Sequence, residues 1–369
     1  MIRSLYVHIP FCVKKCLYCD FNSYSMSSGI QDEYVEYLIK EINSLGIDRF
    51  QTIFVGGGTP TILSLESMEK LLKELSKFSP MEFTLEANPG TLDDDKLKLM
   101  NSYGVNRLSI GLQAWQDRLL KKLGRIHTLD GFLNSYNMAR RHGFNNINID
   151  IMFDIPDQSF EDWIETVEKV KGLKPEHISA YSLIIEEETP FYDMNEKGLL
   201  NLVDEENERN MYWFVVESLE AFGLMQYEIS NFSIPGYECR HNITYWLNEE
   251  YIGVGAGAHS YVSGVRYSNK KGVKSYIEGI KTGNAKENIT FISTDDEMSE
   301  FMFLGLRMIN GISKERFNQR FGVDIYKVYS REIEELKELG LISEKDGFIK
   351  LTKKGIDLSN QVFVKFLRG

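Results

Sequence analysis

The chain has 369 residues, 43% of them hydrophobic and 12% aromatic, which is enough to bury a large core in one big domain and a smaller one. It holds no uninterrupted apolar run of membrane-spanning length, so we expect a soluble protein with at most peripheral membrane contact. The net charge of -12 comes from residues 1–294, which carry 41 acidic and 29 basic side chains, and such an acidic body argues against a nucleic-acid partner.

A strand expected at residues 5–9 leads into three cysteines, Cys12, Cys16 and Cys19, with C-x3-C-x2-C spacing. Three thiolates on one short loop can hold three irons of a 4Fe-4S cluster. No fourth cysteine stands nearby, so the fourth iron would stay open and could chelate a small molecule through an amine and a carboxylate. The spacing therefore predicts a cluster that also binds a second ligand.

Two other uses of these cysteines are zinc binding and a disulfide. A structural zinc site needs four ligands, and the only further cysteine is the distant Cys239, although His8 or His241 could complete a set. A disulfide would imply an oxidising compartment, yet no apolar signal region precedes the cysteines. We therefore expect iron rather than zinc or a disulfide, and a cytoplasmic location.

The first half of the chain alternates short apolar runs with amphipathic stretches, the pattern of βα units around a parallel sheet. Thr91 with Asp94, and Ser159 with Asp162, are typical of capping boxes that open helices. Six units predict an α/β sheet curved into a partial barrel, short of the eight that close one. The expected strands are 5–9, 52–55, 82–86, 107–110, 146–151 and 177–183, and the expected helices are 31–45, 64–77, 93–103, 129–142 and 159–171.

The pattern changes after residue 203. A helix through Phe222, a short strand near 227–229 and an aromatic, glycine-rich stretch to Tyr261 extend the barrel over residues 204–294. Residues 295–369 predict helices followed by a hairpin, a winged-helix-like α+β domain. Its helix near 325–339 carries four glutamates that would oppose DNA phosphates, so we expect a lid or docking element. The predicted domains are therefore 1–203, 204–294 and 295–369.

A glycine run, Gly56-Gly57-Gly58 followed by Thr59, ends the strand expected at 52–55. Without Cβ atoms its backbone can approach a ligand closely, although a tight strand exit would use the same residues. Together with the cysteine loop on the preceding strand, the run resembles the radical S-adenosylmethionine (SAM) superfamily. The resemblance implies that this loop binds the methionine amino group of SAM, and that the cluster serves its reductive cleavage to a deoxyadenosyl radical.

The resemblance narrows to the oxygen-independent coproporphyrinogen oxidase family. It is carried, in order, by residues 6–12, 56–61, 85–89, 109–113, 124–125 and 148–150. It implies an electron donor such as a flavodoxin or ferredoxin. The residues that it implies as SAM contacts are Glu86, Gln113, Arg125 and Asp150, with Tyr18 or Phe21 near the adenine and Tyr6 near the cluster. These residue types suit SAM binding, since carboxylates and amides can share hydrogen bonds with ribose hydroxyls and Arg125 can pair with the SAM carboxylate.

Two features separate the chain from the oxidases and match the HemW subfamily of heme chaperones. Phe21 stands where the oxidases have a fourth cysteine, and the chain begins only a few residues before its first expected strand. The segment His241-Asn242-x-x-Tyr245-Trp246 matches the subfamily's heme-binding element. An imidazole can ligate heme iron and aromatic rings can cover the macrocycle. Cys239 is an alternative iron ligand. The alternative for the whole segment is that it only packs against the barrel and does not bind heme.

We therefore expect a heme chaperone that binds a 4Fe-4S cluster, SAM and heme and delivers heme to heme-acceptor proteins. Two enzyme functions are the alternatives: anaerobic oxidative decarboxylation of coproporphyrinogen, and radical chemistry on another substrate. The glycine-rich run at 253–260 lacks the βαβ context of a dinucleotide site, so we interpret it as close backbone packing near the site.

Overall fold

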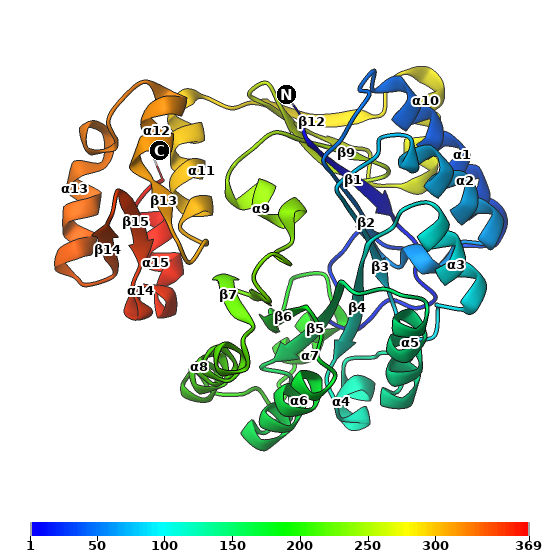
Figure 1. Ribbon diagram of the computed structural model, residues 1–369, viewed down its shortest axis with the longest axis horizontal. Helices are drawn as coiled ribbons and strands as arrows, with labels where there is room; N and C mark the ends of the chain where they lie inside the picture. The colour runs from blue at the N-terminus through cyan, green and yellow to red at the C-terminus, as the bar shows by residue number, and fades with distance from the viewer. Residues whose placement is uncertain (1, 368–369) are drawn as a thin grey trace.

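A computed structural model describes residues 2–367, and in their first half six strands alternate with helices (Figure 1). The strands are β1 (Ser4–Ile9), β2 (Thr52–Gly57), β3 (Glu82–Ala87), β4 (Arg107–Gln113), β5 (Ile147–Phe153) and β6 (His177–Ser182). The helices are α1 (Ser28–Ser44), η1 (Pro60–Ile62, a 3-10 turn), α2 (Leu65–Ser76), α3 (Asp94–Ser102), α4 (Asp117–Lys122), α5 (Leu129–Arg141) and α6 (Phe160–Gly172). Every strand and helix that the sequence predicts in this half is present.

The second half adds strands to the edges of this sheet and ends in a small separate sheet. Up to residue 291 its elements are α7 (Pro190–Glu196), α8 (Glu205–Phe222), β7 (Met225–Glu228), β8 (Asn231–Ser233), α9 (Arg240–Trp246), β9 (Tyr251–Val254), β10 (His259–Val262), β11 (Val265–Asn269), α10 (Val273–Thr282) and β12 (Lys286–Phe291). The C-terminal elements are α11 (Thr294–Gly305), β13 (Ile312–Ser313), α12 (Lys314–Phe321), α13 (Ile325–Glu338), β14 (Ile342–Lys345), β15 (Phe348–Leu351), α14 (Lys353–Asp357) and α15 (Ser359–Val364). None of the helices in residues 2–367 is long and apolar enough to cross a membrane.

The main sheet of the described residues has the strand order β12-β11-β10-β9-β1-β2-β3-β4-β5-β6-β8-β7. β1 to β6 run parallel, and β9 pairs in parallel with the free edge of β1. The outer strands on both sides pair antiparallel. The partial α/β barrel expected from the sequence is confirmed, and the aromatic, glycine-rich stretch proves to be its continuation as β9 to β11.

Helix caps show where local sequence reasoning succeeds and where it fails. The capping box of Ser159 and Asp162 at the start of α6 is confirmed by reciprocal bonds between side chain and backbone. The box expected from Thr91 and Asp94 is wrong. Asp93 is the N-cap of α3, while the Thr91 hydroxyl donates to the Asn88 carbonyl at 2.6 Å. The turn before α3 therefore uses the Thr91 hydroxyl for its own geometry.

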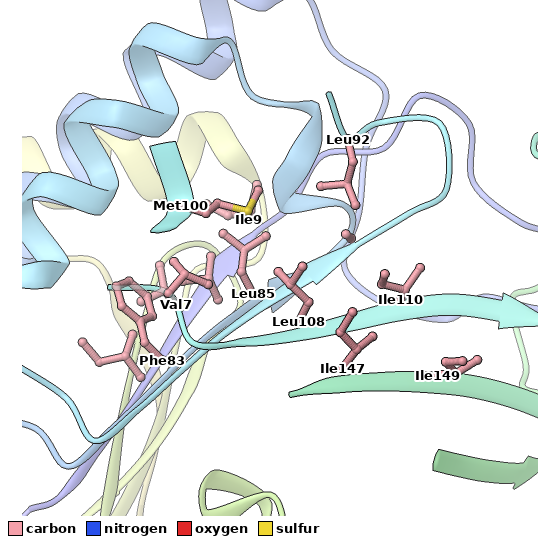
Figure 2. Close-up of a cluster of buried hydrophobic side chains, with 14 of the residues drawn as sticks. Val7, Ile9, Phe83, Leu85, Leu92, Met100, Leu108, Ile110, Ile147 and Ile149 are labelled. Atoms are coloured by element: carbon pink, nitrogen blue, oxygen red, sulfur yellow. The ribbon is translucent and has the colours of Figure 1, made fainter. Parts of the chain in front are cut away.

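Apolar side chains at alternate positions of the parallel strands face the helices and form the core. Figure 2 shows such side chains together on β1, β3, β4 and β5, with Met100 of α3 beside them: Val7, Ile9, Phe83, Leu85, Leu108, Ile110, Ile147 and Ile149. Successive side chains of a strand point to opposite faces, so their neighbours Tyr6, Glu86 and Asp150 face the inside of the barrel. Functional side chains of such folds gather where parallel strands end.

The C-terminal elements pack around a second hydrophobic core of their own. α11, α12 and α13 precede the hairpin of β14 and β15, which β13 extends to three strands. Figure 1 shows this C-terminal unit beside the barrel, with α9 between the two. α9 contacts β2 on one side and α11 on the other. The segment expected to bind heme therefore lies where the two units meet.

Candidate functional site

The loop after β1 presents its three cysteines to a cavity of about 140 Å³. Cys12, Cys16 and Cys19 are free thiols, each partly exposed, and all three line this cysteine cavity. Backbone bonds hold the loop: the Cys12 N–H donates to the Tyr24 carbonyl and the Leu17 N–H to the Leu123 carbonyl, both at 3.0 Å. The fold therefore brings the predicted cluster ligands together on one wall.

The surroundings of the three thiols suit an iron-sulfur cluster. The Arg125 guanidinium lies 3.7 Å from the Cys16 sulfur, and the Thr59 hydroxyl lies 3.6 Å from the Cys12 sulfur. Burial raises the pKa of Cys19 to about 11, so its thiolate form calls for the positive charge of a metal. Thiolates are the ligands of 4Fe-4S clusters. The residues present fit such a cluster and leave one of its irons without a cysteine.

The glycine run at the end of β2 packs against the chain's own side chains. A Cβ at Gly56 would lie 2.8 Å from the Glu86 carboxylate, and one at Gly57 would lie 2.6 Å from the His8 ring. Gly57 also has a φ of +115°, a conformation that other residues rarely adopt. The side chains of neighbouring strands thus occupy the space that these Cβ atoms would fill. From the sequence we expected the missing Cβ atoms to make room for a ligand.

The two residues after Gly57 tie the glycine loop to the cysteine loop. The Gly58 N–H donates to the Ile9 carbonyl at 2.9 Å, and the Thr59 N–H donates to the Phe11 carbonyl at 2.8 Å. A Cβ at Gly58 would lie 2.5 Å from that same Phe11 oxygen and 3.0 Å from the Cys12 sulfur. Only glycine lets the two loops approach this closely.

Two partly buried acidic residues line the cysteine cavity, Glu86 from β3 and Asp150 from β5. Glu86 accepts the Gly57 N–H at 3.1 Å, and Asp150 accepts the Asn148 amide at 2.7 Å and the Ser109 hydroxyl at 3.3 Å. Burial, together with the charge of Asp150, raises the pKa of Glu86 to about 8. Burial also raises the pKa of Asp150 above its ordinary value. Two acids that resist ionisation favour a ligand with positive charge or hydroxyl donors.

Arg125 and Gln113 complete the wall of the cysteine cavity. The Arg125 guanidinium donates to the Asn88 side-chain oxygen at 2.7 Å and to the Gly111 carbonyl at 2.8 Å. Some of the five N–H donors of the guanidinium therefore stay available to a ligand. Gln113 ends β4 with a φ of +74°, beside a bulge in the pairing of β4 with β5. Backbone strain of this kind clusters at functional sites.

The three aromatic residues expected near the cofactors take different places. The Tyr6 hydroxyl shares a 2.9 Å hydrogen bond with His8 Nδ1 on the inner face of β1. Tyr18 lines the cysteine cavity. Phe21 is 61% exposed, although it lines the cysteine cavity and two larger cavities beside it. Phe21 is therefore positioned to cover a ligand at the junction of the three cavities.

The start of α9 is anchored to the barrel by Glu82 of β3. Its carboxylate accepts the backbone N–H groups of Arg240 and His241, both at 2.9 Å. The Cys239 thiol lies 3.6 Å from the same carboxylate and is fully buried. Burial raises the pKa of Cys239 to about 12. The thiolate that iron would need is thus disfavoured at this position.

His241 is 1% exposed and uses both of its ring nitrogens. Nδ1 shares a 2.9 Å hydrogen bond with the Thr52 hydroxyl, and Nε2 shares one of 2.8 Å with the Tyr245 hydroxyl. Burial lowers the pKa of His241 to about 3, so the ring is neutral. The ring faces a cavity of about 480 Å³ inside the barrel, which we call the central cavity. Iron binding by His241 would require one of its two hydrogen bonds to break.

Three residues that the sequence analysis left out of the site line its cavities. Arg107 of β4 is 2% exposed and lines the central cavity, and its Nε has no hydrogen-bond partner among the described residues. Asn88 bridges Thr59 and Arg125 through its amide at 2.6 and 2.7 Å. The alternation of polar and apolar residues along β4 could have revealed Arg107. His259 of β10 lines a further cavity, of about 960 Å³, and no local signal marks it.

A large cavity adjoins the cysteine cavity and has a volume of about 960 Å³. The two share Lys15, Phe21, Gly57 and Glu86 as wall residues. Tyr245 and Trp246 of α9 also line this large cavity, whereas His241 lines only the central cavity. A ligand held at the cysteine cavity would therefore lie next to a space several times larger.

Comparisons with known proteins place this geometry in context. Residues 6–170 match the family model of the radical SAM superfamily, and residues 292–358 match that of the HemN C-terminal domain. The heme chaperone HemW of Bacillus subtilis (strain 168) is 43% identical over 376 residues, covering 99% of both chains. The heme chaperone HemW of Lactococcus lactis subsp. lactis (strain IL1403) is 41% identical, covering 99% of this chain and 97% of its own. The radical SAM enzyme coproporphyrinogen III oxidase (HemN) from Escherichia coli superposes with a TM-score of 0.85 over 99% of this chain and 90% of its own. At 23% identity, that likeness concerns the fold.

Proposed function

The chain belongs to the HemW family of heme chaperones within the radical SAM superfamily, and from this membership we propose that it binds a 4Fe-4S cluster, SAM and heme and delivers heme to heme proteins. The observation that carries the proposal is the junction of the cysteine cavity with a large cavity that has aromatic walls. The relatives named heme chaperones match 99% of the chain, so the proposal concerns the chain as a whole.

Cys12, Cys16 and Cys19 are the proposed ligands of the cluster. When bound, a 4Fe-4S cluster supplies an electron-transfer centre, here with one iron open to a further ligand. Thr59 and Arg125 lie within 3.6 and 3.7 Å of the cysteine sulfurs, where their donor groups can stabilise negative charge on sulfur.

SAM is the proposed ligand of the remaining walls of the cysteine cavity. The free N–H donors of Arg125 suit the carboxylate of the methionine part. The carboxyl groups of Glu86 and Asp150 suit the positively charged and hydroxyl-bearing parts of SAM, and Gln113 can add an amide. The proposed SAM loop runs from Gly56 to Thr59, and Gly57, Gly58 and Thr59 of it line the same space. Tyr6, Tyr18 and Phe21 are the proposed aromatic neighbours.

Heme is the cargo that we place beside α9. Tyr245 and Trp246 line the large cavity and can cover a flat apolar ring. His241 stays a candidate iron ligand because its ring is neutral, although it must first release Thr52 or Tyr245. Cys239 is the weaker candidate, since it would have to lose a proton while buried beside Glu82.

Delivery of heme implies an acceptor protein, and use of the cluster implies an electron donor such as a flavodoxin or ferredoxin. We propose the C-terminal unit as the docking element for a protein partner. Its helix α13 carries Glu332, Glu334, Glu335 and Glu338, whose charge disfavours a nucleic acid. We further propose a cytoplasmic location with at most peripheral membrane contact.

One anaerobic experiment separates the chaperone from the rival oxidase. Protein reconstituted with iron and sulfide is tested in parallel for heme uptake, for heme transfer to an apo-heme protein, and for coproporphyrinogen decarboxylation with SAM and a strong reductant. We expect uptake and transfer without decarboxylation. Robust decarboxylation by the unaltered chain would overturn the chaperone function.

The cysteines supply matched controls for the cluster. Reconstituted protein should hold about four irons per chain, and Cys12→Ala, Cys16→Ala or Cys19→Ala should abolish iron binding. Cys239→Ala should keep the iron, because this thiol is buried elsewhere against Glu82. Stoichiometric zinc with no iron would contradict the proposed cluster.

A further inference from the structure

The large cavity has walls that suit a flat, mostly apolar ligand. Its volume of about 960 Å³ lies at the upper end of the ~300–1,000 Å³ usual for small-molecule sites. The walls come from β1, the cysteine loop, α9, the strands β9 to β11 and α11. Apolar and aromatic side chains on them include Phe21, Tyr245, Trp246, Tyr251, Phe303 and Leu304.

Two histidines line this cavity, and they differ in their hydrogen bonds. His8 is buried and uses both nitrogens: Nε2–H donates to the Asn22 carbonyl at 2.8 Å, and Nδ1 accepts from the Tyr6 hydroxyl at 2.9 Å. His259 is exposed to the cavity, and its ring nitrogens have no hydrogen-bond partner among residues 2–367. Among the histidines on the large cavity, His259 alone can bind a metal without first losing a bond in the described part of the chain.

The backbone places His259 on β10, which is separated from β1 in the sheet by β9. Tyr6 of β1 pairs in register with Gly253 of β9. A Cβ at Gly253 would lie 2.2 Å from the His259 carbonyl oxygen, so glycine lets β10 approach this point closely. The imidazole is thus fixed to a sheet strand rather than to a mobile loop. Rigid placement favours a ligating residue.

Positive charge lies beside His259. Partial burial, together with the charges of Lys271 and Arg266, lowers the pKa of His259, so the ring is neutral and has a lone pair to give. The Arg266 guanidinium donates two hydrogen bonds to the Glu300 carboxylate, at 2.6 and 2.9 Å, which compensate its charge. Lys271 lines the cavity and has no ion pair among the described residues, so it can meet a ligand carboxylate.

We infer that heme binds in the large cavity with its iron ligated by a ring nitrogen of His259 and a propionate paired with Lys271. This inference rests on the proposed function, because it presumes that the chain carries heme. The imidazole donates an electron pair to the iron, and no electron or proton changes place. His241 then acts as a positioning residue, since its Nε2 holds the Tyr245 hydroxyl at the edge of the cavity.

The test is a hemin titration of the reconstituted protein, read as dissociation constant and Soret band. Loss of a residue that only hydrogen-bonds to a metal ligand typically weakens metal binding about 10–100-fold. His259→Ala should therefore weaken heme binding at least about tenfold and shift the Soret band. Free imidazole, added to fill the vacated ligand position, should restore the band of the unaltered protein. His142→Ala is the matched control, because that ring lines none of the three cavities and pairs with the exposed Asp94.

Two further variants make the outcome decisive. Lys271→Gln should weaken binding and reduce its salt dependence while the Soret band stays in place. His241→Ala should leave the band in place, because Tyr245 only loses one bond. An unchanged band in His259→Ala with a changed band in His241→Ala would overturn the inference and leave the proposed function standing. Failure of the unaltered protein to bind hemin would refute the proposed function, and the inference with it.

Discussion

Glu86 shows how one buried acid links the site to the stability of the fold. Its folded pKa of about 8 lies above its ordinary value of 4.5, because the carboxyl group is buried and lies near Asp150. The folded state therefore holds this proton more tightly than the unfolded state does. By proton linkage, the stability from this group is greatest below pH 4.5 and declines as the pH rises toward 8.

Replacing Glu86 by glutamine tests this linkage. Gln keeps an oxygen that can accept the Gly57 N–H but cannot ionise. Without added SAM, Glu86→Gln should be more stable than the unaltered protein by about 4 kcal/mol at pH 8, and the difference should fall below about 1 kcal/mol at pH 5. Urea unfolding at the two pH values measures this. Glu36→Gln, on the exposed face of α1, is the control, and an equal gain at both pH values would contradict the assignment.

Gly57 is the residue where close packing and backbone conformation act together. Gly57→Ala forces a Cβ against the His8 ring and keeps a positive φ, whereas Gly90→Ala keeps a positive φ with nothing within 4 Å. We expect Gly90→Ala to cost about 1 kcal/mol and Gly57→Ala to cost about 1–3 kcal/mol more because of overpacking. Iron loading should fall only in Gly57→Ala, since His8 precedes the cysteine loop. Equal losses in urea unfolding would argue against the contact.

Among the elements, α9 depends most on a partner outside itself. It has seven residues, too few for a stable helix in water. Glu82 of β3 fixes its first turn through the N–H groups of Arg240 and His241. The segment next to the large cavity is therefore held by a side chain far away in the sequence.

Removing that side chain should loosen α9. Glu82→Ala loses two charge-assisted hydrogen bonds and leaves the buried Arg107 with less compensating charge. We expect a loss of about 2–3 kcal/mol in the free energy of unfolding, together with faster amide exchange in α9. Glu66→Ala removes an exposed glutamate paired with Lys70 and should cost less than about 1 kcal/mol. If the two variants lost the same stability, Glu82 would not be an anchor.

The strands β9 to β11 are the elements that sequence reasoning did not assign. β9 has four residues, and glycines lie within it and directly after it. Glycine weakens the period-two pattern by which a strand is recognised. What makes β9 a strand is its parallel pairing with β1, from Ser4 opposite Tyr251 to Val7 opposite Val254. Such a distant partner leaves no mark on the local sequence.

At the scale of the whole molecule, the C-terminal unit closes one side of the large cavity. The Arg316 guanidinium donates to the Leu247 carbonyl at 3.0 Å, and Arg320 donates to the Asn248 carbonyl at 2.7 Å. Arg307 lies over the Trp246 ring, 4.5 Å from its centre. Three arginines thus hold the turn between α9 and β9.

The double variant Arg316→Ala with Arg320→Ala tests this clamp. Hydrogen bonds from charged groups are worth about 1.5–3 kcal/mol each, so residues 247–254 should exchange amide hydrogens at least about tenfold faster. Iron content should not change, because the cysteine loop lies on the barrel. Lys353→Ala, which removes a well-exposed ion pair with Glu217, should alter neither quantity. Unchanged exchange in the double variant would show that the clamp is not needed.

The amino-acid sequence alone predicts the βα alternation, the cysteine loop and the polar residues at the strand ends. These features have a local cause: side-chain period, cysteine spacing and glycine conformation act within a few residues, so they can be read along the chain. Cys12, Cys16 and Cys19 therefore come together on one cavity wall as their spacing predicts.

The three-dimensional packing of the chain brings distant residues onto the same cavity walls. It placed Gly253 next to Tyr6, Glu82 under α9, and His259 on the same cavity as Phe21. It also buried His241 with both nitrogens engaged and made the glycines pack against the chain itself. Burial, cavity volume and hydrogen-bond occupancy depend on contacts between segments far apart in the chain, and no local pattern carries them.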